Sequence, residues 1–409
     1  MLTTTGGNSP QMLVNETARA IQAGELDVAL LVGAEAMFTR FRARRQKAWL
    51  EWTTQEETSP TRVLGDDQSG TNDIEMSRAM ALPTQIYPIF ENSLRAASGA
   101  SIADHSRHIA ELWSRFSAVA AKNPYAWSPN ALSAGEIATV TADNRMIGFP
   151  YTKSMNANLT TDQAAGVIMC SAAAADAAGV TRDRWVFPWS GADGHDHYFV
   201  SERADLHSSP AIRLVGNAAL ELAGVGVDDI AHIDLYSCFP SAVQIGAAEL
   251  GLSLDRQLTI TGGLSFGGGP GNNYSMHAIA TMVETLRGDT GALGLVTSLG
   301  WYITKHAIGV YGTEPPASGH RVARPQEAID ALPRCEFVAE HEGDVTVESY
   351  TVMHERDGTP SLGIVACRLP DARRAWANVR DIDVLRGMTT DEQHGRRGRL
   401  DRDGTLLLS

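Results

Sequence analysis

A glycine-rich loop that runs straight into a helix constrains the fold of this chain more than any other stretch. The segment Thr261–Leu286 reads TGGLSFGGGPGNNYSMHAIATMVETL, and its apolar residues recur at the spacing of one helix face up to Gly288. An apolar run at Leu293–Thr297 then predicts a buried strand. Glycine lets the backbone approach a ligand closely, and the start of a helix offers unpaired N–H groups. The segment therefore predicts a loop–helix–strand unit whose loop meets an anionic or carbonyl oxygen.

The same unit occurs once more near the beginning of the chain. Thr5–Pro10 (TGGNSP) leads into a second helix that ends at Gly24, and Val28–Val32 (VALLV) follows as a strand. The two copies lie about 256 positions apart, which suggests a duplicated α/β fold with pseudo-twofold halves. Loop–helix–strand units are common in any α/β chain, but the shared TGG start favours duplication over coincidence.

Six stretches together resemble one protein family. They are GGNSPQMLVNETARAIQAGELDVALLVGAEAM at 6–37, NPYAW at 123–127, NRMIGFPYTKSMNANLTTDQAAGVIMCS at 144–171, DLYSCFPSAV at 234–243, TGGLSFGGGPGNNYSMHA at 261–278 and SLGWYITKHAIGVYG at 298–312. These stretches are similar to the thiolase superfamily, and more closely to its sterol-carrier-protein-type and thiolase-like protein type 1 branches. The resemblance implies an α/β thiolase fold, with duplicated βαβαβαββ halves layered αβαβα.

The resemblance also implies three domains. Residues 1–190 would be the remainder of the N-terminal thiolase half, with an inserted loop domain at about 38–160 over the active site, and residues 191–315 would be the C-terminal half. The N-terminal half is expected to be incomplete, because a whole thiolase half would contribute roughly ninety residues before the first glycine turn; either the start lies further upstream, or a shortened half leaves apolar strand edges that need cover. Residues 320–409 would form an additional β-domain that resembles an OB-type barrel.

Local patterns predict further elements within these domains. An alanine-rich helix is expected over Thr161–Ala178, with Cys170 packed in it, followed by a strand at Trp185–Pro188. Other predicted elements are the helices Ala110–Ala121, Pro210–Ala223 and Pro240–Leu250 and the strand Ile230–Leu235. Beyond the linker at Pro315-Pro316, the alternating runs Val345–Val352 and Leu362–Cys367 predict a β-hairpin, joined by a turn with Asp357-Gly358.

Composition limits the classes of function. The formal net charge of −14 disfavours non-specific binding to nucleic acid or to an anionic membrane, and it favours a small-molecule or protein partner. No apolar run approaches ~20 residues, and no signal peptide pattern is present, so we expect no membrane span and a cytoplasmic location. The four cysteines lack metal-binding spacing and are expected to be reduced. His195, Asp196 and His197 lie in a polar stretch that is expected to be a loop rather than a metal site.

The catalytic residues that the resemblance implies are all replaced. Thiolases act on coenzyme A thioesters with a nucleophilic cysteine, a base histidine and a second cysteine. Alignment of the matching stretches puts the nucleophile on Gly7, the Gly-His-Pro motif on Gly268, Gly269 and Pro270, and the Cys-x-Gly motif on Ser298-Leu299-Gly300. Ordinary thiolase chemistry is therefore not expected. No cofactor is expected either, with a coenzyme A thioester as substrate or ligand.

Substitute residues can be proposed. The motif His-Asp-Cys-Phe of the sterol-carrier branch reads Tyr236-Ser237-Cys238-Phe239 here, and Cys238 could act with His277 or His306. The alternative is that Cys238 is a buried small residue and that both histidines only pack. The residues expected to line a substrate pocket are Gly7, Asn8, Phe239, Gly268, Gly269, Pro270, Asn273, Ser298 and Gly300; the asparagines among them could instead only form turns.

Three hypotheses follow for the function. The first is an acyl-CoA-recognising protein of the acetyl-CoA acetyltransferase family with its catalytic set replaced. The second is an acyl transferase or thioesterase that uses Cys238. The third is a non-catalytic subunit that forms a homo-oligomer or docks a protein partner through its C-terminal domain. If residue 7 keeps the family's geometry, Gly7→Cys should yield a thiol more reactive than Cys170, because the following helix dipole stabilises a thiolate.

Overall fold

The fold is organised around a five-stranded sheet. The computed structural model describes residues 1–54, 56 and 60–408. The strand order is β11 (Arg321–Ala323), β7 (Phe187–His195), β10 (Lys305–Gly312), β9 (Leu293–Gly300) and β8 (Ile230–Asp234). Strand β8 is parallel to β9, and β10 is antiparallel to both β9 and β7. The strand predicted at Trp185–Pro188 begins two residues later and continues to His195, so His195 is a strand residue rather than a loop residue.

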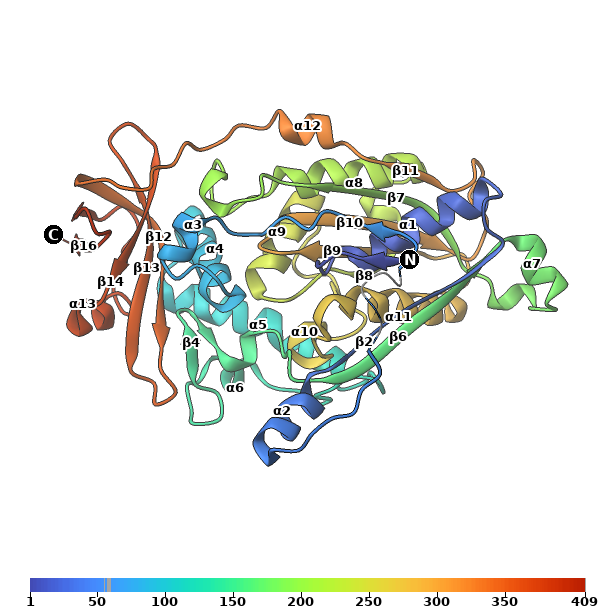
Figure 1. Ribbon diagram of the computed structural model, residues 1–409, viewed down its shortest axis with the longest axis horizontal. Helices are drawn as coiled ribbons and strands as arrows, with labels where there is room; N and C mark the ends of the chain where they lie inside the picture. Colours follow the sequence, from blue (N-terminus) through green and yellow to red (C-terminus); the bar gives the residue numbers. More distant parts are fainter. Residues whose placement is uncertain (55, 57–59, 409) are drawn as a thin grey trace.

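Two pairs of helices cover the two faces of this sheet. Helices α8 (Pro210–Ala223) and α9 (Pro240–Leu250) lie on one face, and α1 (Ser9–Gln22) and α11 (Tyr274–Gly288) lie on the other (Figure 1). The predicted ends of α8 and α9 are confirmed: each starts with a proline and stops at a glycine, Gly224 or Gly251, in the left-handed conformation. The two helices of the repeated unit, α1 and α11, contact each other.

A second sheet lies beyond α1 and α11 and has only two strands. They are β2 (Val28–Ala36) and β6 (Asp162–Cys170), paired antiparallel along their whole length. The prediction of one helix over Thr161–Ala178 is therefore wrong, and only α7 (Ala172–Ala177) is helical. The alanines gave the segment helix propensity, but its side chains alternate between the two faces of the sheet, so pairing with β2 overrides propensity. Cys170 is consequently exposed at the end of β6 rather than packed.

The outer face of this two-stranded sheet is apolar and exposed. Val28, Leu30, Val32 and Ile168 are 53%, 67%, 66% and 72% exposed, whereas Leu31 on the inner face packs against α11 residues. The layers of this part of the molecule are thus helix, five-stranded sheet, helix and two-stranded sheet (Figure 1). Both predicted loop–helix–strand units are present, as α1 with β2 and α11 with β9.

The inserted segment between β2 and β6 is mainly helical. Its elements are α2 (Met37–Gln46), β3 (Val63–Leu64), α3 (Asp73–Ser77), α4 (Pro83–Ser98), α5 (Ile102–Ala120), α6 (Ala134–Ala138), β4 (Met146–Gly148), β5 (Tyr151–Thr152) and a short 3-10 turn at Lys153–Met155. Strand β3 pairs with β1 (Leu2–Thr3). Helices α4 and α5 extend the main core, because Trp113 and Phe116 are buried and stack on each other with ring centroids 5.0 Å apart.

The C-terminal residues form a curved sheet beside the insert. Its strands are β12 (Gly343–His354), β13 (Pro360–Arg368), β14 (Arg374–Val379), β15 (Arg397–Leu400) and β16 (Leu406–Leu408), with α12 (Gln326–Asp330) leading into it and α13 (Ile382–Gly387) packed on it. The predicted hairpin is confirmed as β12 and β13. The two ends of the strand path meet at a single bridge, where Asn378 N donates to Gly404 O over 2.8 Å. Continuous strand pairing does not close this sheet into a barrel.

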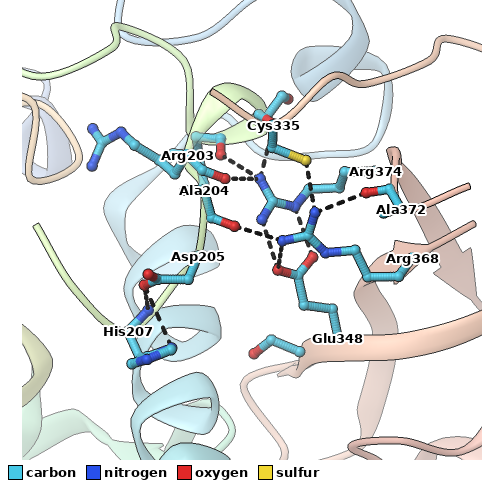
Figure 2. A network of polar contacts seen from close by, with 12 residues as sticks. Arg203, Ala204, Asp205, His207, Cys335, Glu348, Arg368, Ala372 and Arg374 are labelled. Atoms are coloured by element: carbon cyan, nitrogen blue, oxygen red, sulfur yellow. Dashed lines mark hydrogen bonds and ion pairs between the residues drawn. The ribbon is translucent and has the colours of Figure 1, made fainter. Parts of the chain in front are cut away.

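A buried ionic network joins the C-terminal domain to the main body. Arg374, which is 0% exposed, donates to both oxygens of Glu348 and to the carbonyls of Val200, Ser201 and Arg203. Arg368 bridges the same Glu348 to the Ala204 carbonyl. Figure 2 shows both guanidinium groups converging on Glu348, with the Cys335 thiol beside Arg368. Two arginines of the C-terminal domain, Arg368 and Arg374, therefore fix it to the main body through hydrogen bonds to backbone carbonyls.

Candidate functional site

The two glycine loops meet beside the ends of β8 and β9. Gly6 N donates to Asn272 Oδ1 over 3.1 Å, and Ser275 Oγ donates to Gly7 O over 3.0 Å. Asn273 Nδ2 also donates to the Gly33 carbonyl over 2.6 Å. The two loops that begin with TGG thus lie at one site.

Tyr236 fills the space that a side chain at residue 7 would need. A Cβ atom built on Gly7 would lie 2.4 Å from the Tyr236 hydroxyl and 2.4 Å from the Leu299 carbonyl oxygen. Burial raises the pKa of this hydroxyl, and the neighbouring Cys238 adds to the effect. A neutral phenol therefore stands where the resemblance places a nucleophile. The sequence carried a signal for this pairing, because Tyr236 replaces the first residue of the His-Asp-Cys-Phe motif.

Tyr236 also lines an internal cavity of about 20 Å³, together with Ser298, Leu299 and His306. A cavity needs roughly 10–15 Å³ of this kind of volume to hold one water molecule. Ser298 Oγ and His306 Nε2 are both buried without a hydrogen-bond partner in the described part of the chain. The space left at this position can take a water molecule, and it is too small for a thioester.

His306 is a neutral imidazole at physiological pH. Burial lowers its pKa to about 4, and Arg203 acts in the same direction while Asp196 opposes it. Among the described residues, its hydrogen bond is to the Ile303 backbone, which leaves Nε2 unpartnered.

This pKa predicts a loss of stability in acid. Between pH ~6.5, the unfolded value, and pH ~4, the unfolded chain binds a proton that the folded protein does not, so the free energy of unfolding falls as pH falls through this window. We expect parent protein to lose about 1–3 kcal/mol more than His306→Asn between neutral pH and pH ~4. Urea unfolding at both pH values measures the difference. An equal loss of stability in parent and variant would show that His306 has the same pKa in the folded protein as in the unfolded chain.

Cys238 is buried rather than poised for attack. Its side chain is 7% exposed, and burial raises the thiol pKa to about 12 although a hydrogen bond with Tyr87 lowers it. The next residue, Phe239, stacks on Tyr87 with ring centroids 4.4 Å apart. Within the described residues, no hydrogen bond joins Cys238 to His277 or His306. These three candidate catalytic residues therefore stand apart, and each is surrounded by a different set of neighbours.

A buried carboxylate fixes the second glycine loop. Asp234 Oδ2 accepts from Thr259 Oγ1, Ile260 N and both donors of Thr261, and Oδ1 accepts from Tyr274 Oη over 2.8 Å. Burial raises the pKa of Asp234, and these donors lower it. Sequence reasoning missed Asp234, and an acid at the end of an apolar strand was the available signal.

A more spacious cavity lies between β6 and α11, and we call it the β6–α11 cavity. It measures about 350 Å³, and Gly268 and His277 line it together with Gln163, Tyr125 and Tyr274. Burial lowers the pKa of His277 to about 4. Gln163 Nε2 donates to the carbonyls of Tyr125 and Gly267, while Gln163 Oε1 and His277 Nε2 have no partner within the described chain. A Cβ on Gly268 would lie 2.0 Å from Gln163 Oε1, so only glycine leaves room for this amide.

The other predicted pocket residues lie elsewhere. Gly269 N donates to Asn158 O over 2.9 Å, and Pro270 O accepts from Asn273 N over 2.9 Å. Asn8 lines a separate cavity of about 230 Å³ beside Lys305. Asn8 Oδ1 would lie 2.6 Å from a Cβ on Gly300, so Gly300 makes room for Asn8.

The histidines around Asp196 have protein partners. His195 Nδ1 contacts the Asp196 carbonyl and His197 Nε2 contacts the Leu332 carbonyl, while Asp196 lies 3.5 Å from Arg203. Across the part of the chain that the structure describes, no group of three or more His, Cys, Asp or Glu side chains is placed to hold a metal ion. No helix there has the length and apolar content of a membrane span.

Comparison with known proteins gives three findings. Residues 325–405 match the model of the thiolase-like protein type 1 additional C-terminal domain. The crystal structure of a monomeric SCP2-thiolase-like protein type 1 from Mycobacterium smegmatis aligns with a TM-score of 0.84 and 34% identity, covering 99% of this chain and 83% of that one. The dimeric peroxisomal thiolase of Saccharomyces cerevisiae aligns with a TM-score of 0.50 and 16% identity, covering 76% and 75%. No curated protein matches the sequence.

The last of these structures shows the thiolase fold alone, since its identity is low. The mycobacterial protein is similar over almost the whole of this chain, and the C-terminal domain model matches independently. The chain therefore belongs to the thiolase-like protein type 1 family of the thiolase superfamily.

Proposed function

We propose that this protein recognises acyl-CoA without covalent thiolase chemistry and holds it in the β6–α11 cavity. The observation that carries the proposal is that two residues lining this cavity, Gln163 and His277, each carry a buried polar atom, Oε1 and Nε2, without a hydrogen-bond partner among the described residues. Its volume of about 350 Å³ falls in the range typical of small-molecule sites. The pantetheine arm of coenzyme A carries two amide N–H groups and one free hydroxyl, and the proposal is that one of these donates to the Gln163 oxygen.

Two further features support binding without catalysis. The His277 pKa of about 4 keeps the ring neutral, so it meets an amide or hydroxyl as a hydrogen-bonding group without a charge. The nucleophile position is filled by Tyr236, and the adjoining cavity of about 20 Å³ has no room for an acyl group. Both features support the proposal that acyl-CoA is a ligand of this protein and not its covalent substrate.

Titration calorimetry with acetyl-CoA and longer acyl-CoAs tests the proposal. We expect parent protein to bind, and Gln163→Leu and His277→Leu each to weaken binding about 3- to 10-fold, the effect of one lost neutral hydrogen bond. His207→Leu is the matched control, because His207 is exposed outside the cavity. If no acyl-CoA gave binding heat or raised the melting temperature, the proposal that this protein binds acyl-CoA would be wrong. Binding that neither variant weakens would move the site out of this cavity.

A further inference from the structure

Residues 37–52, which we call the basic arm, differ in charge from the rest of the molecule. The segment reads MFTRFRARRQKAWLEW and carries Arg40, Arg42, Arg44, Arg45 and Lys47, with no acidic residue before Glu51. The chain as a whole has a formal net charge of −14. Figure 1 shows α2 of this arm projecting from the edge of the body.

One side of α2 is anchored, and the other is free. Thr39 N and Oγ1 donate to the two carboxylate oxygens of Asp162, over 3.0 and 2.5 Å, and Ala43 one turn later is buried. Residues four apart share a helix face, so this face is turned to the body. Phe38 fixes the start of the helix further by an edge contact with Trp127, with ring centroids 5.5 Å apart.

The remaining surface of the arm combines cations with aromatic rings. All five cationic side chains are exposed, and no carboxylate of the described residues forms an ion pair with them. Phe38 and Phe41 are 41% and 40% exposed, and Trp49 and Trp52 are 87% and 52% exposed. Exposed aromatic rings are unfavourable to leave in water, and their position beside five exposed cations on the same short segment marks an interaction surface.

We propose that the basic arm docks this protein on the surface of an anionic phospholipid bilayer. Guanidinium groups bind lipid phosphates, and tryptophan and phenylalanine rings settle at the headgroup level, where an apolar body and a polar environment are both available. The charge pattern favours this partner, because juxtamembrane Lys and Arg are attracted to anionic lipid headgroups. Asp162 and Glu51 lie at the arm and offset part of its charge, whereas acidic groups beyond ~8–10 Å are screened at physiological salt.

Other occupants fit the observations less well. Small-molecule sites are concave, and no residue of the basic arm lines any of the three cavities described above. A second copy of this chain would offer acidic groups for the cations, but the similar mycobacterial protein is described as monomeric. A bilayer accommodates both halves of the surface, the cations and the rings.

Vesicle sedimentation with the full-length protein is the test. Parent protein is expected to sediment with vesicles of phosphatidylcholine mixed with phosphatidylglycerol, and not with phosphatidylcholine alone. The triple variant Arg42→Gln/Arg44→Gln/Arg45→Gln should bind on the order of a hundredfold more weakly, since each cation contributes about a fivefold effect near an anionic surface. The matched control removes three exposed arginines from the C-terminal domain: Arg386→Gln/Arg399→Gln/Arg402→Gln.

A second readout reports on the rings. Anionic vesicles should shift the fluorescence of Trp49 to the blue and protect it from iodide, and Trp49→Phe should abolish that part of the signal. The proposal is overturned if parent protein ignores anionic vesicles, if both triple variants bind equally, or if Trp49 stays open to iodide. It is also overturned if coenzyme A releases the protein from vesicles and the arm variant loses coenzyme A binding, because the arm would then hold the nucleotide.

Discussion

Replacement of Arg374 by alanine is expected to lower the free energy of unfolding by about 3–5 kcal/mol, the effect of removing one partner from a buried ion pair. The guanidinium is 0% exposed and donates to three carbonyls of the segment Val200–Arg203 as well as to Glu348. Alanine would remove the Arg374 donors from all three carbonyls, of which the Val200 carbonyl keeps one bond, from Arg203 N over 3.2 Å. Trp376 depends on the same contact surface, because its Nε1 donates to Ser201 Oγ over 2.8 Å.

Urea unfolding, followed by circular dichroism and by tryptophan fluorescence, measures this effect. Arg386→Ala is the control, because its ion pair with Asp383 is exposed, and such surface pairs contribute less than about 1 kcal/mol. Arg374→Met separates charge from volume: it keeps the packing of the stem but removes the donors, and it should recover only part of the loss. A stability of Arg374→Ala within about 0.5 kcal/mol of the parent would mean that this network does not hold the two domains together.

The sequence suggested a separate C-terminal domain, whereas in the structure this network attaches the domain to the main body. A proline-rich linker and a change of pattern after residue 315 predicted a distinct β-domain, and its hairpin was confirmed. Its union with the body depends on contacts far apart in sequence, such as Arg95 of α4 with Glu392 and Ser349 Oγ with the Ile89 carbonyl. No local pattern carries such pairings, so sequence reasoning could place the domain but not its attachment.

The elements of the fold were predictable where local residues determine them, and not where a distant partner does. The ends of helices α8 and α9 are determined by local residues, a proline at the start and a glycine at the end. Their predicted boundaries were confirmed. The prediction for Asp162–Cys170 was wrong. Its alanines favour a helix, but the segment forms a strand because it pairs with β2, more than a hundred residues earlier. Strand propensity depends on such tertiary partners more than helix propensity does.

The candidate site was predictable in its loops and not in its side chains. The residue types predicted the two TGG turns, and the contact between the turns is a finding of the structure. That Tyr236 fills the space above Gly7, and that Gln163 lines the β6–α11 cavity, depend on side-chain packing between distant segments. Asp234, which holds the second loop, was missed for the same reason.

Tyr236 reverses the expectation for Gly7→Cys. A cysteine Cβ would meet both the tyrosine hydroxyl and the Leu299 carbonyl at 2.4 Å, and overpacking of this kind typically costs about 1–3 kcal/mol. The new thiol would be wedged under the ring, whereas Cys170 is exposed. We therefore expect Gly7→Cys to be destabilised and its thiol to react with iodoacetamide more slowly than Cys170. Gly288→Cys is the control, because a Cβ at Gly288 meets nothing within 4 Å.

Removal of the Tyr236 ring should change both the stability cost of Gly7→Cys and the reactivity of the new thiol. In a Tyr236→Ala background, Gly7→Cys should cost less than in the parent by about 1–2 kcal/mol, which a double-mutant cycle in urea measures as coupling between the two residues. The thiol would then lie open beside the start of α1, where the helix dipole lowers its pKa and speeds alkylation. Thiolysis of acetoacetyl-CoA should stay at background in both variants, because Gly269 and Ser298 supply no general base, a contribution typically of ~10²–10⁴-fold. If Gly7→Cys alone were as stable as the parent and reacted faster than Cys170, Tyr236 would have to move aside freely, and the closed site described above would be an open one.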